Sequence, residues 1–111
     1  MINFDVLRSY MDDDEDIIQA VFTAFLEEHE DGSDKILSHY TAQNWSDLFL
    51  TAHSLKGILS SFGESDTVAR LQSIENATRD GIAPHEDDVQ HVIKGLAVIN
   101  QQVIDYLASA S

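Results

Sequence analysis

The sequence predicts an all-α protein, an antiparallel up-and-down four-helix bundle with a short additional N-terminal helix. Apolar residues recur at the three- and four-residue spacing of amphipathic helices along most of the 111 residues. The chain has one proline, Pro84, and no run of alternating β-branched residues that would indicate strands. A chain of this length can bury an adequate core, so we expect residues 1–111 to form a single domain.

The N-terminal part predicts a short helix and then a longer one. Asn3 is placed to cap a helix that runs through about Tyr10. The acidic residues 12–16 favour the positive end of a second helix. They do not form a calcium loop, because glycine is missing and Thr23 stands at the twelfth position. The second helix has this apolar stripe: Ile17, Ile18, Val21, Phe22, Phe25 and Leu26, resuming at Ile36, Leu37 and Tyr40.

A polar stretch, residues 27–35, interrupts that stripe. Its Asp31-Gly32-Ser33-Asp34 sequence is locally typical of a turn between two helices. The apolar residues after it nearly keep the helical phase and need a core. We therefore expect one long helix, kinked or frayed near Gly32.

Three further helices follow. Asn44, with Asp47 three residues later, predicts the start of a helix that extends to Phe62. Gly63 gives a turn, and Ser65 or Asp66 then caps a helix that ends at Gly81. The last helix begins after Pro84 with residues 86–88, which are acidic. The apolar stripes of the three helices are Leu48, Thr51, Leu55, Ile58, Leu59 and Phe62; Val68, Leu71, Ile74 and Ala77; and Val89, Val92, Ile93, Leu96, Ile99, Val103, Tyr106 and Leu107.

His53 lies on the face of its helix opposite to the apolar stripe. Residues three and four positions away are its surface neighbours, which places Phe49, Lys56 and Gly57 beside it and Ser60 one turn further on. A glycine within a helix costs about 1 kcal/mol relative to alanine. On this outer face, Gly57 would let another surface approach the imidazole closely.

One short motif contains His53: it is the run Ala52-His53-Ser54-Leu55-Lys56-Gly57, followed by Gly63, Ile74-Glu75 and Arg79-Asp80-Gly81. With these residues, the sequence resembles the histidine-containing phosphotransfer (HPt) domain family. The resemblance covers about residues 5–107 and also implies one long second helix. The chain departs from the family pattern at Glu64, where alanine is frequent, and at Thr67, where leucine is frequent. These departures affect packing and not the residues that would handle phosphate.

The resemblance implies a phosphorelay intermediate. In this hypothesis Nε2 of His53 attacks an aspartyl phosphate on a receiver domain and then passes the phosphoryl group to another receiver. Lys56 and Arg79 would meet the phosphate oxygens, and Gly57, Ser60 and Phe49 would contact the partner. The implied partners are response-regulator receiver domains and a hybrid sensor histidine kinase, and the aspartate and magnesium belong to the receiver. No glycine-rich nucleotide loop is present, so we expect no cofactor and no autonomous kinase activity.

Charge and composition exclude other functions. The net charge of −14 argues against nucleic acid or an anionic membrane as a partner. Eleven of the 20 acidic residues lie in residues 1–34, whereas Lys56, Arg70 and Arg79 are three of the six basic ones, so the region around His53 should be less negative. The chain has no cysteine, no apolar run long enough to cross a bilayer and no secretion signal. We expect a cytoplasmic monomer.

The sequence leaves two other functions open. A metal-carboxylate bundle would need Glu-x-x-His pairs, and the nearest match is Asp88 with His91. An acidic protein-interaction adaptor would use the charge and require no histidine. The sequence identifies neither the receivers nor the physiological output, and the chain could be free-standing or a domain of a hybrid kinase.

Overall fold

The computed structural model describes residues 1–110, and all of the regular structure in them is helical, which confirms the all-α prediction. The helices are α1 (Phe4–Tyr10), α2 (Glu15–His29), α3 (Gly32–Thr41), α4 (Trp45–Ser61), α5 (Asp66–Arg79) and α6 (Glu86–Ala110). Within these residues, no helix combines the length and apolar character needed to cross a membrane.

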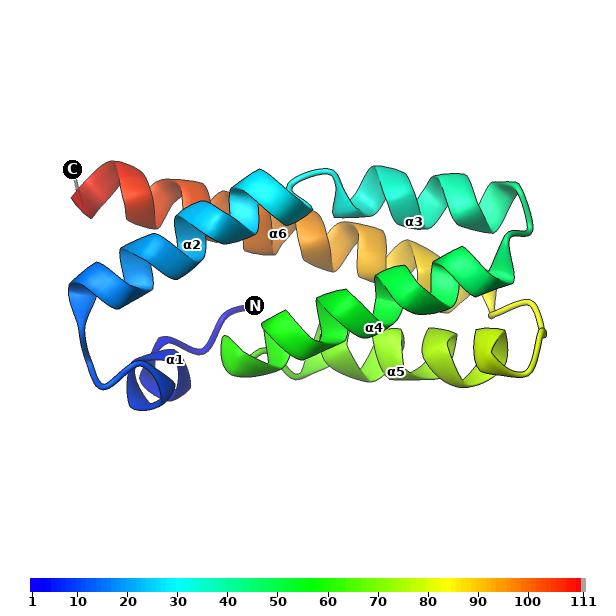
Figure 1. Ribbon diagram of the computed structural model, residues 1–111, viewed down its shortest axis with the longest axis horizontal. Coiled ribbons are helices and arrows are strands. Elements are labelled where there is room, and N and C mark those ends of the chain that lie inside the picture. Colours follow the sequence, from blue (N-terminus) through cyan, green and yellow to red (C-terminus); the bar gives the residue numbers. More distant parts are fainter. Residues whose placement is uncertain (111) are drawn as a thin grey trace.

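The helices form an elongated body of 42 × 21 × 19 Å (Figure 1). The long helix α6 packs against α2 and α3, which follow one another along it. Helix α4 packs against α3 and α5, and α5 packs against α6. The chain reverses direction at the turns between α3 and α4, α4 and α5, and α5 and α6, while α1 lies near the C-terminal end of α4. Helix α4 therefore has neighbours on both sides and a free outer face.

The predicted caps Asn3 and Asn44 hold α1 and α4, and one residue of the predicted acidic run caps α2. The Asn3 Oδ1 atom accepts hydrogen bonds from the backbone N–H groups of residues 5 and 6, at 3.1 and 3.2 Å. Asp14 caps α2 through the N–H groups of residues 16 and 17. Asn44 caps α4 by accepting from the Asp47 N–H group at 3.4 Å. Each cap satisfies donors that a helix start otherwise leaves unpaired.

The expectation of one long second helix is wrong. Glu30 and Asp31 form a turn that separates α2 from α3, as the local alternative indicated (Figure 1). Gly32, the first residue of α3, is buried, and a Cβ atom there would lie 3.4 Å from a methyl group of Leu55 and 3.7 Å from one of Leu96. The break lets the start of α3 approach both α4 and α6 and turns Ile36 fully into the core.

Two residues of the predicted stripe are not core residues. Ile17 is 43% exposed and Leu37 is 44% exposed. Ile17 precedes Ile18, and Leu37 follows Ile36. In both pairs, the partner, Ile18 or Ile36, is fully buried. A helix turns by about 100° per residue, so only one of two adjacent side chains can point to the centre of the core.

Helix α5 begins differently from the prediction. Neither Ser65 nor Asp66 caps it with its side chain. The Oε1 atom of the buried Glu64 accepts hydrogen bonds from the N–H groups of Thr67 and Val68, at 2.7 and 3.1 Å. A carboxylate is favoured at this positive end of a helix. Glu64, which departs from the family pattern, is thus the residue whose side chain caps the N-terminus of α5.

Two mid-helix glycines, each preceded by a lysine, lie in opposite surroundings. A Cβ atom on Gly57 would meet nothing within 4 Å, whereas one on Gly95 would lie 2.2 Å from Oγ1 of Thr67. Gly95 therefore permits the close contact of α5 with α6, and Gly57 has no such role in packing.

We predict that Gly57→Ala raises the free energy of unfolding by up to about 1 kcal/mol, because alanine is the better helix former. Gly95→Ala should lower it by about 1–3 kcal/mol, because the added methyl group overpacks the contact with Thr67. Urea denaturation of the two variants and the parent protein measures both changes. Destabilisation by Gly57→Ala would contradict the open surroundings of that glycine.

Candidate functional site

His53 stands in the middle of the outer face of α4. Its side chain is 63% exposed, as its position on the helix predicts. One turn before it, the Phe49 ring stacks against the imidazole, with ring centroids 6.0 Å apart and an angle of 13° between the planes. The apolar stripe on the opposite side of α4, including Leu55 and Leu59, is buried and holds the helix in place.

A carboxylate from α5 joins the imidazole to the lysine one turn further on. The Oε1 atom of Glu75 lies 2.5 Å from Nδ1 of His53, and its Oε2 atom lies 2.5 Å from Nζ of Lys56. The Glu75 side chain is only 3% exposed. Both α4 side chains thus share one buried carboxylate, which fixes them relative to each other.

The ion pair determines the charge of this carboxylate. Burial of Glu75 raises the pKa of its carboxyl group. Hydrogen bonds from Lys56 and His53, together with their positive charge, lower this pKa by a larger amount. The net result is a pKa below the ordinary value of 4.5, so Glu75 is ionised at neutral pH. An ionised carboxylate has no hydrogen to donate and can only accept hydrogen bonds.

The hydrogen bond to Glu75 therefore selects one form of the imidazole. Because Oε1 can only accept, Nδ1 of His53 must carry the hydrogen. In the neutral ring the lone pair then resides on Nε2. Within residues 1–110, no hydrogen bond occupies Nε2. The site presents a nucleophilic nitrogen with a fixed orientation on an exposed side chain.

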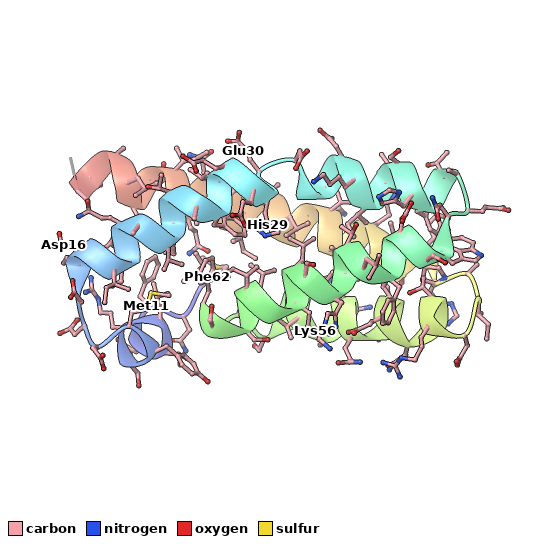
Figure 2. The ribbon with its side chains drawn as sticks, viewed as in Figure 1. Met11, Asp16, His29, Glu30, Lys56 and Phe62 are labelled. Carbon is pink, nitrogen blue, oxygen red and sulfur yellow. The ribbon has the colours of Figure 1, made fainter. Side chains whose placement is uncertain are left out.

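Lys56 lies at the seam between α4 and α5, on the edge of α4 that faces α5 (Figure 2). In addition to its ion pair with Glu75, its ammonium group donates a hydrogen bond to Oε1 of Gln72 at 3.0 Å. The side chain is 23% exposed, so it is partly covered by these contacts. Lys56 is close to the imidazole as predicted, and in this state its charge is paired within the site.

The other predicted residues lie around this centre. The guanidinium carbon of Arg79 is 5.9 Å from the Phe49 ring centroid, so Arg79 reaches the site through Phe49 and does not contact the imidazole. Gly57 is exposed beside His53, and Ser60, also exposed, donates to the Lys56 carbonyl at 2.7 Å. A shallow hollow next to Phe49 is lined by Ser46, Phe49, Leu50, Thr78 and Arg79.

The chain contains a second His-x-x-Lys-Gly sequence, at residues 91–95 of α6. There Asp66 of α5 lies 2.9 Å from Nε2 of His91, the nitrogen that is free on His53. The His91 side chain is 38% exposed, and Gly95 packs directly under Thr67. The same residue spacing therefore gives neither a free Nε2 nor an open glycine at this second position.

Glu75 belongs to the motif that resembles the family, but the sequence alone assigned it no role. A signal was present in the sequence, because Glu75 lies four residues after Leu71 and therefore next to the apolar stripe of its helix. In the structure, both residues are buried. A carboxylate on the core side of a helix requires a partner. Within the described part of the chain, no group of three or more His, Asp or Glu side chains is placed to hold a metal ion.

The model of the Hpt domain family matches residues 20–108 of the chain. Members of this family carry out histidine phosphotransfer in two-component signalling, interact with receiver domains and kinases, and are not themselves kinases. Because the match covers most of its length, the chain belongs to the Hpt domain family. Helix α1 and the first turn of α2 precede the matched residues. Searches of curated proteins and of solved structures gave no match.

The lowered pKa of Glu75 makes its contribution to stability depend on pH. A group whose pKa is lower in the folded state stabilises the fold above its unfolded value, here 4.5, and this contribution is lost as the pH falls through the folded value. We predict that the stability advantage of the parent protein over Glu75→Gln shrinks as the pH falls below 4.5. Urea denaturation across this range measures it, and an advantage that grows on acidification would contradict the ion pair.

Proposed function

We propose that His53 is the phosphoacceptor of a phosphorelay, taking a phosphoryl group from an aspartyl phosphate on one receiver domain and passing it to another. The observation that carries this proposal is the orientation of a single side chain. Glu75 holds Nδ1 of His53 at 2.5 Å, and the side chain is 63% exposed with Nε2 unoccupied. A nucleophile that must enter the active site of another protein needs this combination of fixed orientation and access.

The transfer step exchanges one bond to phosphorus for another. The Nε2 lone pair approaches phosphorus in line with the leaving carboxylate, the N–P bond forms, and the P–O bond to the receiver aspartate breaks. The hydrogen on Nδ1 stays in its hydrogen bond with Glu75. The magnesium ion and the aspartate that the reaction requires belong to the receiver, and this chain supplies the imidazole.

Charge neutralisation and access are the tasks of the surrounding residues. Lys56 lies one turn from His53 and can meet a phosphate oxygen by exchanging its hydrogen bond to Gln72 for one to the phosphate. Arg79, held against Phe49, adds a second positive charge at the edge of the site. The open surroundings of Gly57 leave room for a receiver loop, and Ser60 lies two turns from His53 on the same face.

The partners we propose are response-regulator receiver domains and a hybrid sensor histidine kinase, which would phosphorylate the first receiver. The chain would act as a monomeric, single-domain cytoplasmic intermediate without kinase activity of its own. The alternative, an acidic adaptor, would need the charged surface and no histidine. It therefore predicts a different result for a histidine substitution.

The test is transfer from a phosphorylated receiver domain to the chain, followed as acid-labile, alkali-stable phosphate. We predict that His53→Gln abolishes labelling, because it removes the nucleophile. The matched control is His91→Gln, which changes the histidine of the second His-x-x-Lys-Gly sequence and should retain labelling. Label on another histidine would refute the site, and labelling that survives His53→Gln would refute the assignment of His53.

Gly57→Ala separates access from folding. The added methyl group points into open space, so the variant should fold at least as well as the parent protein. We predict that it nevertheless slows phosphotransfer from a receiver by about tenfold, the change in rate that corresponds to a loss of about 1.4 kcal/mol in the docked transition state. Unchanged transfer rates would show that the receiver does not approach Gly57.

A further inference from the structure

We propose that Glu75 is a positioning residue for the second half of the relay: it retains a proton on Nδ1 of phosphorylated His53 and so keeps the phosphoryl group transferable. This inference rests on the proposed phosphoacceptor role of His53. It concerns what happens after the N–P bond has formed, and it assigns one carboxylate a role in both directions of the reaction.

The phosphorylated ring has two forms, which differ in whether Nδ1 carries a hydrogen. A ring that carries phosphorus on Nε2 and hydrogen on Nδ1 is positively charged. When its N–P bond breaks, with the bond electrons returning to Nε2, a neutral imidazole leaves. A phosphorylated ring that has lost the Nδ1 hydrogen would instead have to leave as an imidazolate anion, which is a much poorer leaving group. The protonated form is therefore the one that passes phosphorus to the next aspartate.

The geometry favours the protonated form. The Glu75 oxygen is 2.5 Å from Nδ1, and the carboxylate is 3% exposed, so water screens the attraction between it and the charged ring only weakly. The Nδ1 hydrogen is in this hydrogen bond before the attack, stays there while phosphorus resides on Nε2, and remains when phosphorus leaves. No proton has to enter or leave the site during acceptance and donation.

Lys56 opposes this effect of Glu75. Its ammonium group, 2.5 Å from Oε2, neutralises part of the carboxylate charge. Other charged or titratable groups also border this part of α4. Arg79 contacts Phe49, and His29, Asp31 and Lys35 line the hollow that borders Ser54, where Asp31 and Lys35 form their own ion pair at 3.6 Å. Changes at Glu75 and Lys56 should therefore shift the proton equilibrium in opposite directions.

The experiment loads phosphorus without a receiver. The full chain, labelled with ¹⁵N-histidine, is phosphorylated with phosphoramidate, and NMR follows the pH at which the phosphorylated ring loses its Nδ1 proton. The loaded protein is then mixed with an unphosphorylated receiver domain, and the rate of transfer is normalised to the amount of phosphohistidine. The variants are Glu75→Gln, Lys56→Gln and, as a matched control, Asp66→Asn, which alters the carboxylate on the other paired histidine.

We expect Glu75→Gln to lower the pH of Nδ1 proton loss by about one unit or more, the usual effect of removing an opposite charge at this distance. Above that pH, onward transfer should slow by up to about tenfold, while in acid it should match the parent protein. Lys56→Gln should move the proton loss to higher pH, and this variant gives a second test if Glu75→Gln does not fold. Asp66→Asn should change neither measurement.

Two outcomes would overturn the inference, and they are distinguishable. If His53 becomes phosphorylated but loses its Nδ1 proton at the same pH in the parent protein, Glu75→Gln and Lys56→Gln, the role of Glu75 is refuted and the phosphoacceptor role stands. If neither phosphoramidate nor any receiver phosphorylates His53, the proposed function fails and this inference fails with it.

Discussion

The site depends on one buried carboxylate that is shared by two side chains of the neighbouring helix. Removing a carboxylate from water is costly unless charged partners replace the lost hydration. Glu75 has two such partners, Nδ1 of His53 and the ammonium group of Lys56, each at 2.5 Å. The same contacts that make burial of Glu75 tolerable also orient the imidazole and position the lysine. Stability and chemistry therefore rest on a single arrangement of α4 against α5.

That arrangement comes from the turn between the two helices and from their neighbours. Gly63 adopts a positive φ of 68°, which glycine tolerates, and the next residue, Glu64, starts α5 through its side chain. The chain thus reverses within a few residues. This reversal places Glu75 beside His53, although the two residues are 22 positions apart in the sequence. Rigid helices on both sides hold the residues of the site more precisely than loops could.

Much of the fold and part of the site could be predicted, because helical periodicity depends only on residues that are close together in the sequence. The apolar stripes gave most of the core, asparagines before them gave the caps of α1 and α4, and an acidic run marked the start of α2. The face opposite to the stripe of α4 gave the exposure of His53. The expectation failed where tertiary contacts compete with the local pattern. The break before Gly32 depends on how closely the start of α3 approaches Leu55 of α4 and Leu96 of α6, and local spacing does not encode those distances.

The sequence by itself determined which segments are helical, which face of each is apolar, and that a histidine, a lysine and a glycine share an outward ridge, since these follow from 3.6 residues per turn. Only the tertiary structure decided that Glu75 reaches that histidine, and that of two His-x-x-Lys-Gly sequences one has a free Nε2 and an open glycine while the other does not. The physical reason is that contacts between residues on different helices depend on the packing register of whole helices, which no short stretch of sequence specifies.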